Sequence, residues 1–404
     1  MPNISTRGVL MPPSPIRKLV KHSNDAKARG VKVFHLNIGQ PDIRTPEVAL
    51  DALRKINLKI LEYSPSEGNK SLREEMVKYY QRFNINVSPD DIFITTGGSE
   101  AVSMAFIACL NPGDGVIIPE PAYANYKSFA LAAGVIPKPL VSSINQGFAL
   151  PNIEEFEKLI NEKDANIRAI LVCNPNNPTG YIYSKEEMEK IRDLVIKYDL
   201  FLFADEVYRE FCYSGHEHVS SFHLQGIEQN VVLIDSVSKR FSECGIRIGA
   251  LVTKNKDIQD AVMKLCQARL SPPLLGQIVA EESFRSTPKE YMQEVYDEYI
   301  SRRNCLINAL NAIDGVYSPM PQGAFYTVAR LPVDNAEDFC KWLLTDFQYN
   351  GKTVMLAPAS GFYTDTENNG IDEVRIAYVL EKKELIEAVE VLKKALEAYP
   401  GRKR

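Results

Sequence analysis

The sequence of 404 residues lacks the paired cysteines that bind zinc or build a disulfide framework. No two cysteines make a Cys-x-x-Cys pair, and all seven stand singly, at Cys109, Cys173, Cys212, Cys244, Cys266, Cys305 and Cys340. Isolated cysteines are typical of chains kept in a reducing compartment. We therefore expect no metal site, no disulfide and a cytoplasmic location.

Two further absences narrow the possible functions. No apolar run is long enough to span a bilayer, and the opening stretch MPNISTRGVLMPPSP lacks the apolar core of a signal peptide. Lys and Arg number 47 against 52 Asp and Glu, a formal net charge of −5, so no basic field favours nucleic acid or an anionic membrane as a partner. Apolar residues make up 45% of the chain and charged residues 25%, which is typical of a globular protein.

The first two thirds of the sequence contain short apolar runs that alternate with amphipathic segments. Helical spacing of apolar residues covers 45–60, 71–83 and 184–198, and the last segment opens with a capping box of Ser184 and Glu187. Buried strands that alternate with helices favour a mostly parallel sheet covered on both faces, an α/β fold. The expected strands lie within 90–110, 113–123, 167–180, 200–208, 230–239 and 247–253.

The last third has a different pattern. Residues 276–313 are helical, with a break or a helix start at Pro288. Extended stretches and a last amphipathic helix follow, at 323–332, 353–362, 372–380 and 381–399. This pattern indicates a smaller α+β domain. We expect a large domain at 47–285 and a small domain that combines 1–46 with 286–404 and closes over a substrate.

Unusual polar residues follow several of the expected strands, where the ligands of parallel sheets bind. They are Gly97–Ser99, Asn177, Asp205 and Lys239. Alone, Lys239 would more often be a lysine that reaches solvent, whereas a Schiff-base lysine needs its amine held out of water. Asp205 ends the apolar run FLFAD, where a carboxylate either caps the next turn or keeps a pyridinium nitrogen protonated.

Neighbouring residues are candidates for binding a phosphate. The turn TTGGSEA puts Gly98 and Ser99 at a helix start, where backbone N–H groups bind phosphate, although many such turns are merely glycine-rich. Arg247 lies between Gly245 and Gly249, small residues that let the backbone approach closely, and its guanidinium is a second phosphate ligand.

Asn177 and four further residues have both a structural and a functional interpretation. A tyrosine in the core, a polar turn and a strand salt bridge are the ordinary roles of such residues. The functional roles are a phosphate ligand, two donors to a phenolate oxygen, a ring that stacks on a flat ligand and a guanidinium that binds a substrate carboxylate. The candidates for these roles are, in that order, Ser236, Asn177 with Tyr208, Tyr123 and Arg375.

The order and spacing of these residues resemble the class I/II aminotransferases, aspartate aminotransferase-like enzymes of fold type I that use pyridoxal phosphate. The similarity covers essentially the whole chain. It rests on Ser236-x-x-Lys239 with Arg247 and Gly249, and on NPNNPTG (174–180), ADEVY (204–208), YSPSEGNKSLRE (63–74) and NIGQPD (37–42). The family implies a large cofactor-binding domain with a mostly parallel sheet flanked by helices, and a smaller α+β domain.

The resemblance also implies a role for each candidate. Lys239 would form the aldimine with pyridoxal 5'-phosphate and move the proton, with Asp205 and Tyr208 as the other catalytic residues. The cofactor would be bound by Gly98, Ser99, Tyr123, Asn177, Asp205, Tyr208, Ser236, Lys239, Arg247 and, from the neighbouring subunit of a homodimer, Tyr63. The substrate α-carboxylate would meet Gly39, Asn177 and Arg375.

The substrate is less well defined by the resemblance. Some aspartate-specific relatives carry a lysine in the phosphate turn to bind the second carboxylate, and here that position is Ser99, which leaves Arg44 or a partner-subunit residue for this role. We expect ping-pong transfer from an L-amino acid, aspartate first, to a 2-oxo acid such as 2-oxoglutarate. The alternatives are an aminotransferase for aromatic amino acids or alanine and a carbon–sulfur β-lyase.

Overall fold

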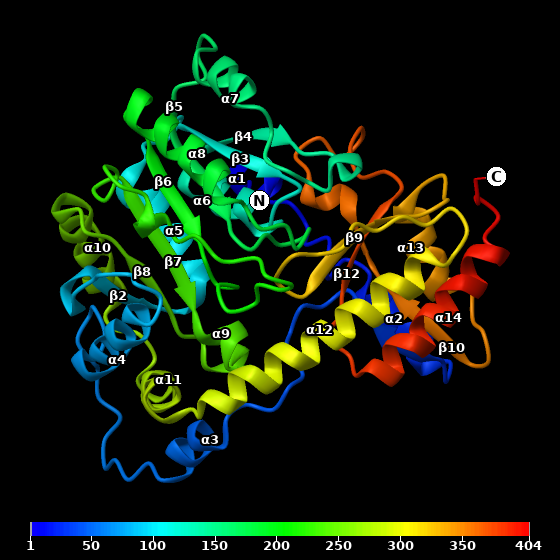
Figure 1. Ribbon diagram of the computed structural model, residues 1–404, viewed down its shortest axis with the longest axis horizontal. Coiled ribbons are helices and arrows are strands. Elements are labelled where there is room, and N and C mark those ends of the chain that lie inside the picture. Colours follow the sequence, from blue (N-terminus) through cyan, green and yellow to red (C-terminus); the bar gives the residue numbers. More distant parts are fainter. Residues whose placement is uncertain (1, 404) are drawn as a thin grey trace.

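The computed structural model describes residues 2–403, and its largest element is a seven-stranded sheet (Figure 1). Across the sheet the strands are β2 (Ile92–Thr95), β8 (Gly249–Val252), β7 (Val231–Ser236), β6 (Phe201–Asp205), β5 (Ile167–Cys173), β3 (Gly115–Glu120) and β4 (Ile136–Val141). Strands β7, β6, β5, β3 and β4 run parallel to one another. Strand β8 runs antiparallel to both of its neighbours, β7 and β2. The expected mostly parallel sheet is confirmed.

Helices cover both faces of this sheet because its strands are apolar on both sides. Phe203 of β6 packs into one core, and Leu202 and Ala204 pack into the other, as the alternation of side chains along a strand requires. One face is covered by α5 (Gly97–Cys109), α6 (Asn125–Ala133) and α10 (Lys256–Arg269), and the other by α4 (Lys70–Gln81), α7 (Ile153–Ile160), α8 (Lys185–Tyr198) and α11 (Leu274–Ser286). The capping box predicted at the start of α8 is present.

Two smaller sheets lie beside the large one and join the two ends of the chain. They consist of β1 (Lys32–His35) parallel to β10 (Lys352–Met355), and of β11 (Ala357–Pro358), β12 (Glu373–Ala377) and β9 (Tyr326–Arg330) in antiparallel order. Around them are α2 (Val20–Ala28), α13 (Ala336–Thr345), α14 (Lys382–Ala398) and the long α12 (Lys289–Asn311), which Figure 1 shows running between the two parts. Pro288 is indeed a helix start, since it is the N-cap of α12. The domain boundaries at 46/47 and 285/286 stay predictions.

The remaining helices are short. They are α1 (Thr6–Leu10), α3 (Glu47–Arg54), α9 (Val237–Arg240) and the 3₁₀ turns η1 (Pro89–Asp91), η2 (Ile144–Gln146), η3 (Ser221–His223), η4 (Cys244–Ile246) and η5 (Ala359–Phe362). The helix expected over 45–60 was therefore predicted too long, because it ends at Arg54. Beyond that residue Ile60 and Leu61 lie exposed in an extended segment, which leaves the body of the molecule in Figure 1.

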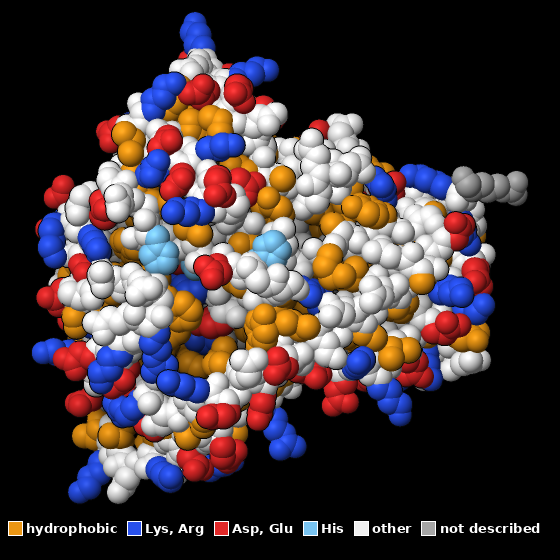
Figure 2. Space-filling model, in the orientation of Figure 1, with side chains coloured by type: hydrophobic (Ala, Val, Ile, Leu, Met, Phe, Trp, Pro, Cys, Tyr) orange, Lys and Arg blue, Asp and Glu red, His pale blue; other side chains and the backbone are white. Residues whose placement is uncertain are grey.

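The molecular surface carries charges of both signs. Figure 2 shows Lys and Arg interspersed with Asp and Glu over the visible face, in keeping with the nearly balanced charge of the sequence. Between residues 2 and 403 no helix is both long enough and apolar enough to cross a membrane.

Candidate active site

Lys239 lies one helical turn beyond the large sheet, and not at a strand end as the sequence suggested. Strand β7 stops at Ser236 because the hydroxyl of this residue accepts a hydrogen bond from the backbone N–H of Ser238, at 3.2 Å, and starts the four-residue helix α9. The ammonium group of Lys239 is half-buried and donates to the carbonyl oxygen of Gly39 at 3.0 Å. The amine is therefore held toward residues from the other end of the chain.

The Gly39 carbonyl group that accepts from Lys239 also contacts Tyr326, which in turn contacts Tyr208. The Tyr326 phenol donates to the same Gly39 oxygen at 3.2 Å, and its own oxygen lies 3.0 Å from the phenol oxygen of Tyr208. A β-carbon at Gly39 would overlap the Tyr326 ring, so this close approach requires glycine. Sequence analysis missed Tyr326, because a tyrosine at the start of an apolar strand carries no signal that separates it from a core residue.

Arg375 is buried on β12 without a carboxylate partner among the described residues. Its two terminal nitrogens donate to the backbone oxygen of Asn37, at 2.5 Å, and to the side-chain oxygen of Asn177, at 3.2 Å, while its Nε has no hydrogen-bond partner. The Asn177 amide nitrogen lies 3.5 Å from the Tyr208 phenol oxygen. Burial lowers the pKa of the Arg375 guanidinium. A buried guanidinium with a free N–H is suited to binding an anion.

Asp205 is a buried carboxylate that has no cationic partner in the described chain, just as Arg375 has no carboxylate partner. Its carboxylate accepts hydrogen bonds from the Tyr126 phenol, at 2.6 Å, and from the Val207 backbone, at 3.4 Å. Desolvation by burial raises the pKa of Asp205 to about 6. The ring of Tyr123 meets that of Tyr126 edge to face, with centroids 5.4 Å apart. Tyr126 was missed because PAYANY contains two tyrosines, and nothing in the local sequence shows which of them meets Asp205.

The glycine turn and Arg247 come together at the start of α5. Gly98 and Ser99 stand in its first turn, where backbone N–H groups have no intrahelical acceptor. One nitrogen of the Arg247 guanidinium lies against Gly97 and is 3.5 Å from the Thr96 carbonyl oxygen. A row of donors at a helix start beside a guanidinium can bind a phosphate.

The two glycines around Arg247 have different surroundings. A β-carbon on Gly249 would come within 2.7 Å of the Gly98 backbone nitrogen, so glycine is needed there for close approach. A β-carbon on Gly245 would meet nothing within 4 Å, and the same expectation for Gly245 was wrong. Ser236 is paired with Gly249 across the sheet, and its hydroxyl donates to the Ile248 carbonyl oxygen at 3.0 Å. The candidate phosphate ligands are therefore neighbours.

Two candidates lie apart from this cluster. The Tyr63 side chain is 76% exposed on the extended segment between α3 and α4. Arg44 is exposed, and its backbone oxygen accepts a hydrogen bond from the Tyr291 phenol at 3.0 Å. Within residues 2–403 no hydrogen bond or ion pair joins either side chain to Lys239, Asp205 or their partners.

The donor set fits pyridoxal phosphate in its chemistry. The half-buried amine of Lys239 matches an aldehyde, the unpaired carboxylate of Asp205 matches a ring cation, and the start of α5 with Arg247 matches a phosphate. Arg375 remains for a substrate carboxylate. Over the described residues no three His, Cys, Asp or Glu side chains gather as metal ligands would.

Comparison with known proteins gives a consistent result. The family model for aminotransferases of class I and II matches residues 31–392. An aspartate aminotransferase from Pyrococcus horikoshii is 30% identical over 98% of this chain and 97% of its own length. Solved structures of aspartate aminotransferase from Thermus thermophilus with maleate and of alanine aminotransferase from Pyrococcus furiosus superpose with TM-scores of 0.88 and 0.89. They are 26% and 28% identical, and each alignment covers 98% of this chain and all of the other.

Proposed function

This chain belongs to the aminotransferase class I and II family and is a pyridoxal-phosphate-dependent aminotransferase, and we propose that it transfers the amino group of L-aspartate to 2-oxoglutarate by a ping-pong route. The observation that carries the proposal is one connected set of polar contacts. Lys239 meets Gly39, Tyr326 and Tyr208 link Gly39 to Asn177, and Asn177 meets the buried Arg375. This set combines an amine able to carry a proton with an anion-binding guanidinium.

The residues of the chain divide the work between cofactor and substrate. When bound, pyridoxal phosphate supplies an electron sink for the bond that breaks at the α-carbon. Lys239 would hold the cofactor and move the proton at its Nζ, and Asp205 would keep the ring nitrogen protonated. The residues that would bind the remaining cofactor groups are Gly98, Ser99, Ser236 and Arg247 for the phosphate, Asn177 and Tyr208 for the phenolic oxygen and Tyr123 for the ring face.

The substrate α-carboxylate would bind between Arg375, Asn177 and the Gly39 backbone. The free Nε of Arg375 supports this role, because a carboxylate accepts parallel hydrogen bonds from two guanidinium nitrogens. Desolvation makes such a charge-assisted pair stronger than it is in water.

A dicarboxylic substrate is favoured by two observations on the relatives. The P. horikoshii relative is named an aspartate aminotransferase, and the T. thermophilus structure contains maleate, a dicarboxylate. In this chain Ser99 stands where some such enzymes carry lysine, so the second carboxylate would pair with Arg44 after domain closure or with a residue of a partner subunit.

A half-reaction screen tests the substrate. The purified protein is mixed with each amino acid in turn, and loss of the absorbance of the lysine-bound cofactor is followed. We expect aspartate and glutamate to react fastest. Reaction with alanine or aromatic amino acids alone would contradict the dicarboxylate proposal, and reaction that releases a thiol without an acceptor acid would indicate β-lyase chemistry.

We also infer a cytosolic homodimer. The seven cysteines are all free, as in a reducing compartment. Tyr63 and the apolar side chains of Leu58, Ile60 and Leu61 are exposed on one extended segment, which suits burial against a second copy. Sedimentation of the purified protein should give twice the chain mass, and Tyr63→Phe should weaken phosphate binding only if Tyr63 reaches a neighbouring site.

A further inference from the structure

A row of buried charges lies directly behind the candidate site. Its members, which we call the charge row, alternate in sign: Glu206, Arg209, Asp235, Arg240 and Glu210. Strand geometry explains its place, because successive side chains point to opposite faces. Asp205 therefore faces the candidate cofactor site while Glu206 faces away from it, and Ser236 and Asp235 are related in the same way.

Asp235 is the centre of the charge row. One of its oxygens accepts from Arg240 Nη2 at 2.6 Å, and the other accepts from Arg209 Nη1 at 3.2 Å. The Tyr80 phenol and the Ser236 backbone N–H donate to the same carboxylate, at 2.8 and 2.7 Å. Desolvation pushes the pKa of Asp235 up, but the two guanidinium groups outweigh it and leave the pKa below its ordinary value. The carboxylate is therefore charged.

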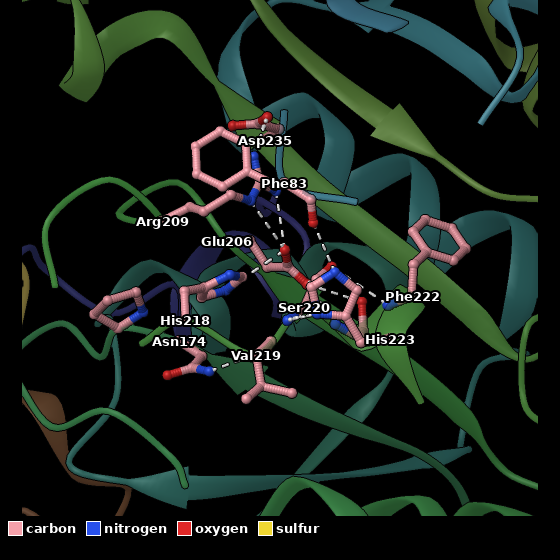
Figure 3. Close-up of polar contacts among 12 residues, drawn as sticks. Phe83, Asn174, Glu206, Arg209, His218, Val219, Ser220, Phe222, His223 and Asp235 are labelled. Atoms are coloured by element: carbon pink, nitrogen blue, oxygen red, sulfur yellow. Dashed lines mark hydrogen bonds and ion pairs between the residues drawn. The ribbon is translucent and has the colours of Figure 1, made fainter. Parts of the chain in front are cut away.

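The outer members fix the two ends of the row. Arg209 Nη2 donates to Glu206 Oε2 at 2.9 Å (Figure 3). The other carboxylate oxygen, Oε1, accepts from the backbone N–H of Ser221 and the hydroxyl of Ser220, at 2.8 and 3.0 Å. At the other end Arg240 Nε lies 2.7 Å from a Glu210 oxygen. Both arginines are almost completely buried.

Such a row is poor evidence for extra stability. The cost of desolvating a buried ion pair often cancels the attraction between its charges. Apolar residues of equal volume can stabilise the fold to the same extent. What a buried network of directional bonds does supply is a defined geometry. Here it spans the two turns that carry the candidate catalytic groups. Asp205 is the last residue of β6 and Arg209 lies in the turn after it, and Lys239 and Arg240 lie in α9, the helical turn after β7.

We propose that Asp235, by bridging Arg209 and Arg240, is a positioning residue that holds the turn of Lys239 in register with the turn of Asp205. The proposal rests on the proposed function, since these two side chains must meet the same cofactor. Asp235 and Arg240 touch neither cofactor nor substrate and act through their chain neighbours. No general fold-stabilising role requires one carboxylate to join these two turns.

The test uses Arg240→Lys in the full-length holoenzyme. Lysine keeps the charge but has no second nitrogen, so it cannot donate to Asp235 as Arg240 Nη2 does while another nitrogen stays in ion-pair contact with Glu210. We expect kcat to fall by about 10-fold to 100-fold, as for a small misplacement of reacting groups, with little change in KM. The visible circular dichroism of the bound cofactor should change, while the far-ultraviolet spectrum should not.

Two further variants separate positioning from stability. Arg303→Lys removes another buried guanidinium, which donates to the Pro321 carbonyl oxygen and the Ser214 hydroxyl, at 3.0 and 2.9 Å, and among the described residues makes no hydrogen bond or ion pair with the charge row. It should lower the melting temperature and leave kcat and the visible spectrum unchanged. Asp235→Asn should reproduce the effects of Arg240→Lys. If it does not fold, Arg240→Lys with its control decides the question alone.

The outcomes distinguish this proposal from the proposed function. If the wild type holds no cofactor on Lys239 after borohydride reduction, the proposed function and the positioning role both fall. If the wild type is active and Arg240→Lys retains its kcat and visible spectrum, only the positioning role is overturned. An equal loss in Arg303→Lys would overturn it too, because any lost buried arginine would then have the same effect.

Discussion

Replacing Asp205 by asparagine should make the cofactor-free protein more stable at neutral pH. The carboxylate is buried with two hydrogen-bond donors and, among residues 2–403, no cationic partner, and desolvation raises its pKa from 3.8 to about 6. A raised acid pKa means that folding is opposed wherever the group must be ionised. The cost is absent below pH 3.8 and grows as the pH rises, reaching its full size above pH 6. At about 1.4 kcal/mol per pH unit it amounts to ~3 kcal/mol.

Asparagine removes this charge and keeps the shape, and the Tyr126 phenol can turn to satisfy the amide. Urea unfolding of the cofactor-free proteins at pH 7.5 should therefore show the variant more stable than the wild type by up to ~3 kcal/mol. The difference should shrink toward pH 4, where the wild-type carboxylate is protonated in the folded state.

Adding pyridoxal phosphate should reverse the order. The wild type gains a partner for its charge and should be strongly stabilised, whereas the variant lacks that pair. Turnover of the variant should fall by orders of magnitude, since the ring nitrogen loses its proton. A cofactor-free variant that is less stable than the wild type at pH 7.5 would refute the raised pKa assigned to Asp205. Near-normal turnover of the variant would mean that Asp205 serves only to cap the turn after β6.

Two other substitutions test separate parts of the site, and a third tests a buried carboxyl outside it. Lys239→Ala should abolish turnover but leave non-covalent cofactor binding, and peptide mapping after borohydride reduction of the wild type should find the label on Lys239 and on no other lysine. Arg375→Lys should lower kcat/KM for both amino and 2-oxo substrates by about 2–5 kcal/mol in transition-state binding, with an unchanged cofactor spectrum, because both substrates carry the α-carboxylate. Loss confined to dicarboxylic substrates would assign Arg375 to the side chain instead. Glu243 is buried, accepts from Ser283 at 2.5 Å and has its pKa raised by desolvation to about 8. The cost of its ionisation grows from pH 4.5 to 8, so Glu243→Gln should flatten the fall in melting temperature over that range, and a parallel fall in both proteins would contradict the shift.

Local spacing was enough to predict the residues that follow the central strands. Asp205 ends an apolar run and Lys239 closely follows one, and the glycine turn before Ser99 and the arginine at 247 stand out in the same way. Each of these features can be recognised from the few residues that precede and follow it in the sequence. The parallel sheet follows equally from the local alternation of apolar runs and helices.

Residues that depend on distant contacts were not predictable. Tyr326 joins the site only because β9 brings it against Gly39, 287 positions earlier in the sequence. Tyr126 and Tyr123 look alike in the sequence, and only the fold selects Tyr126 as the hydrogen-bond donor to Asp205. The end of α3 at Arg54 was missed for a related reason, since the helical spacing of apolar residues continues to Ile60, whereas Ile60 is exposed in the structure.

The pairing of β1 with β10 has a consequence for biosynthesis. Its partners are separated by 320 positions, from Lys32 to Lys352, so a ribosome adding about 5–20 residues per second needs roughly 16–64 s to complete the pair. The large sheet, whose last strand ends at Val252, is translated well before then. Nascent chains can therefore form that sheet before Tyr326, which contacts Gly39 in the finished structure, has been synthesised. An aborted or truncated translation product would be folded over much of its length and catalytically inert.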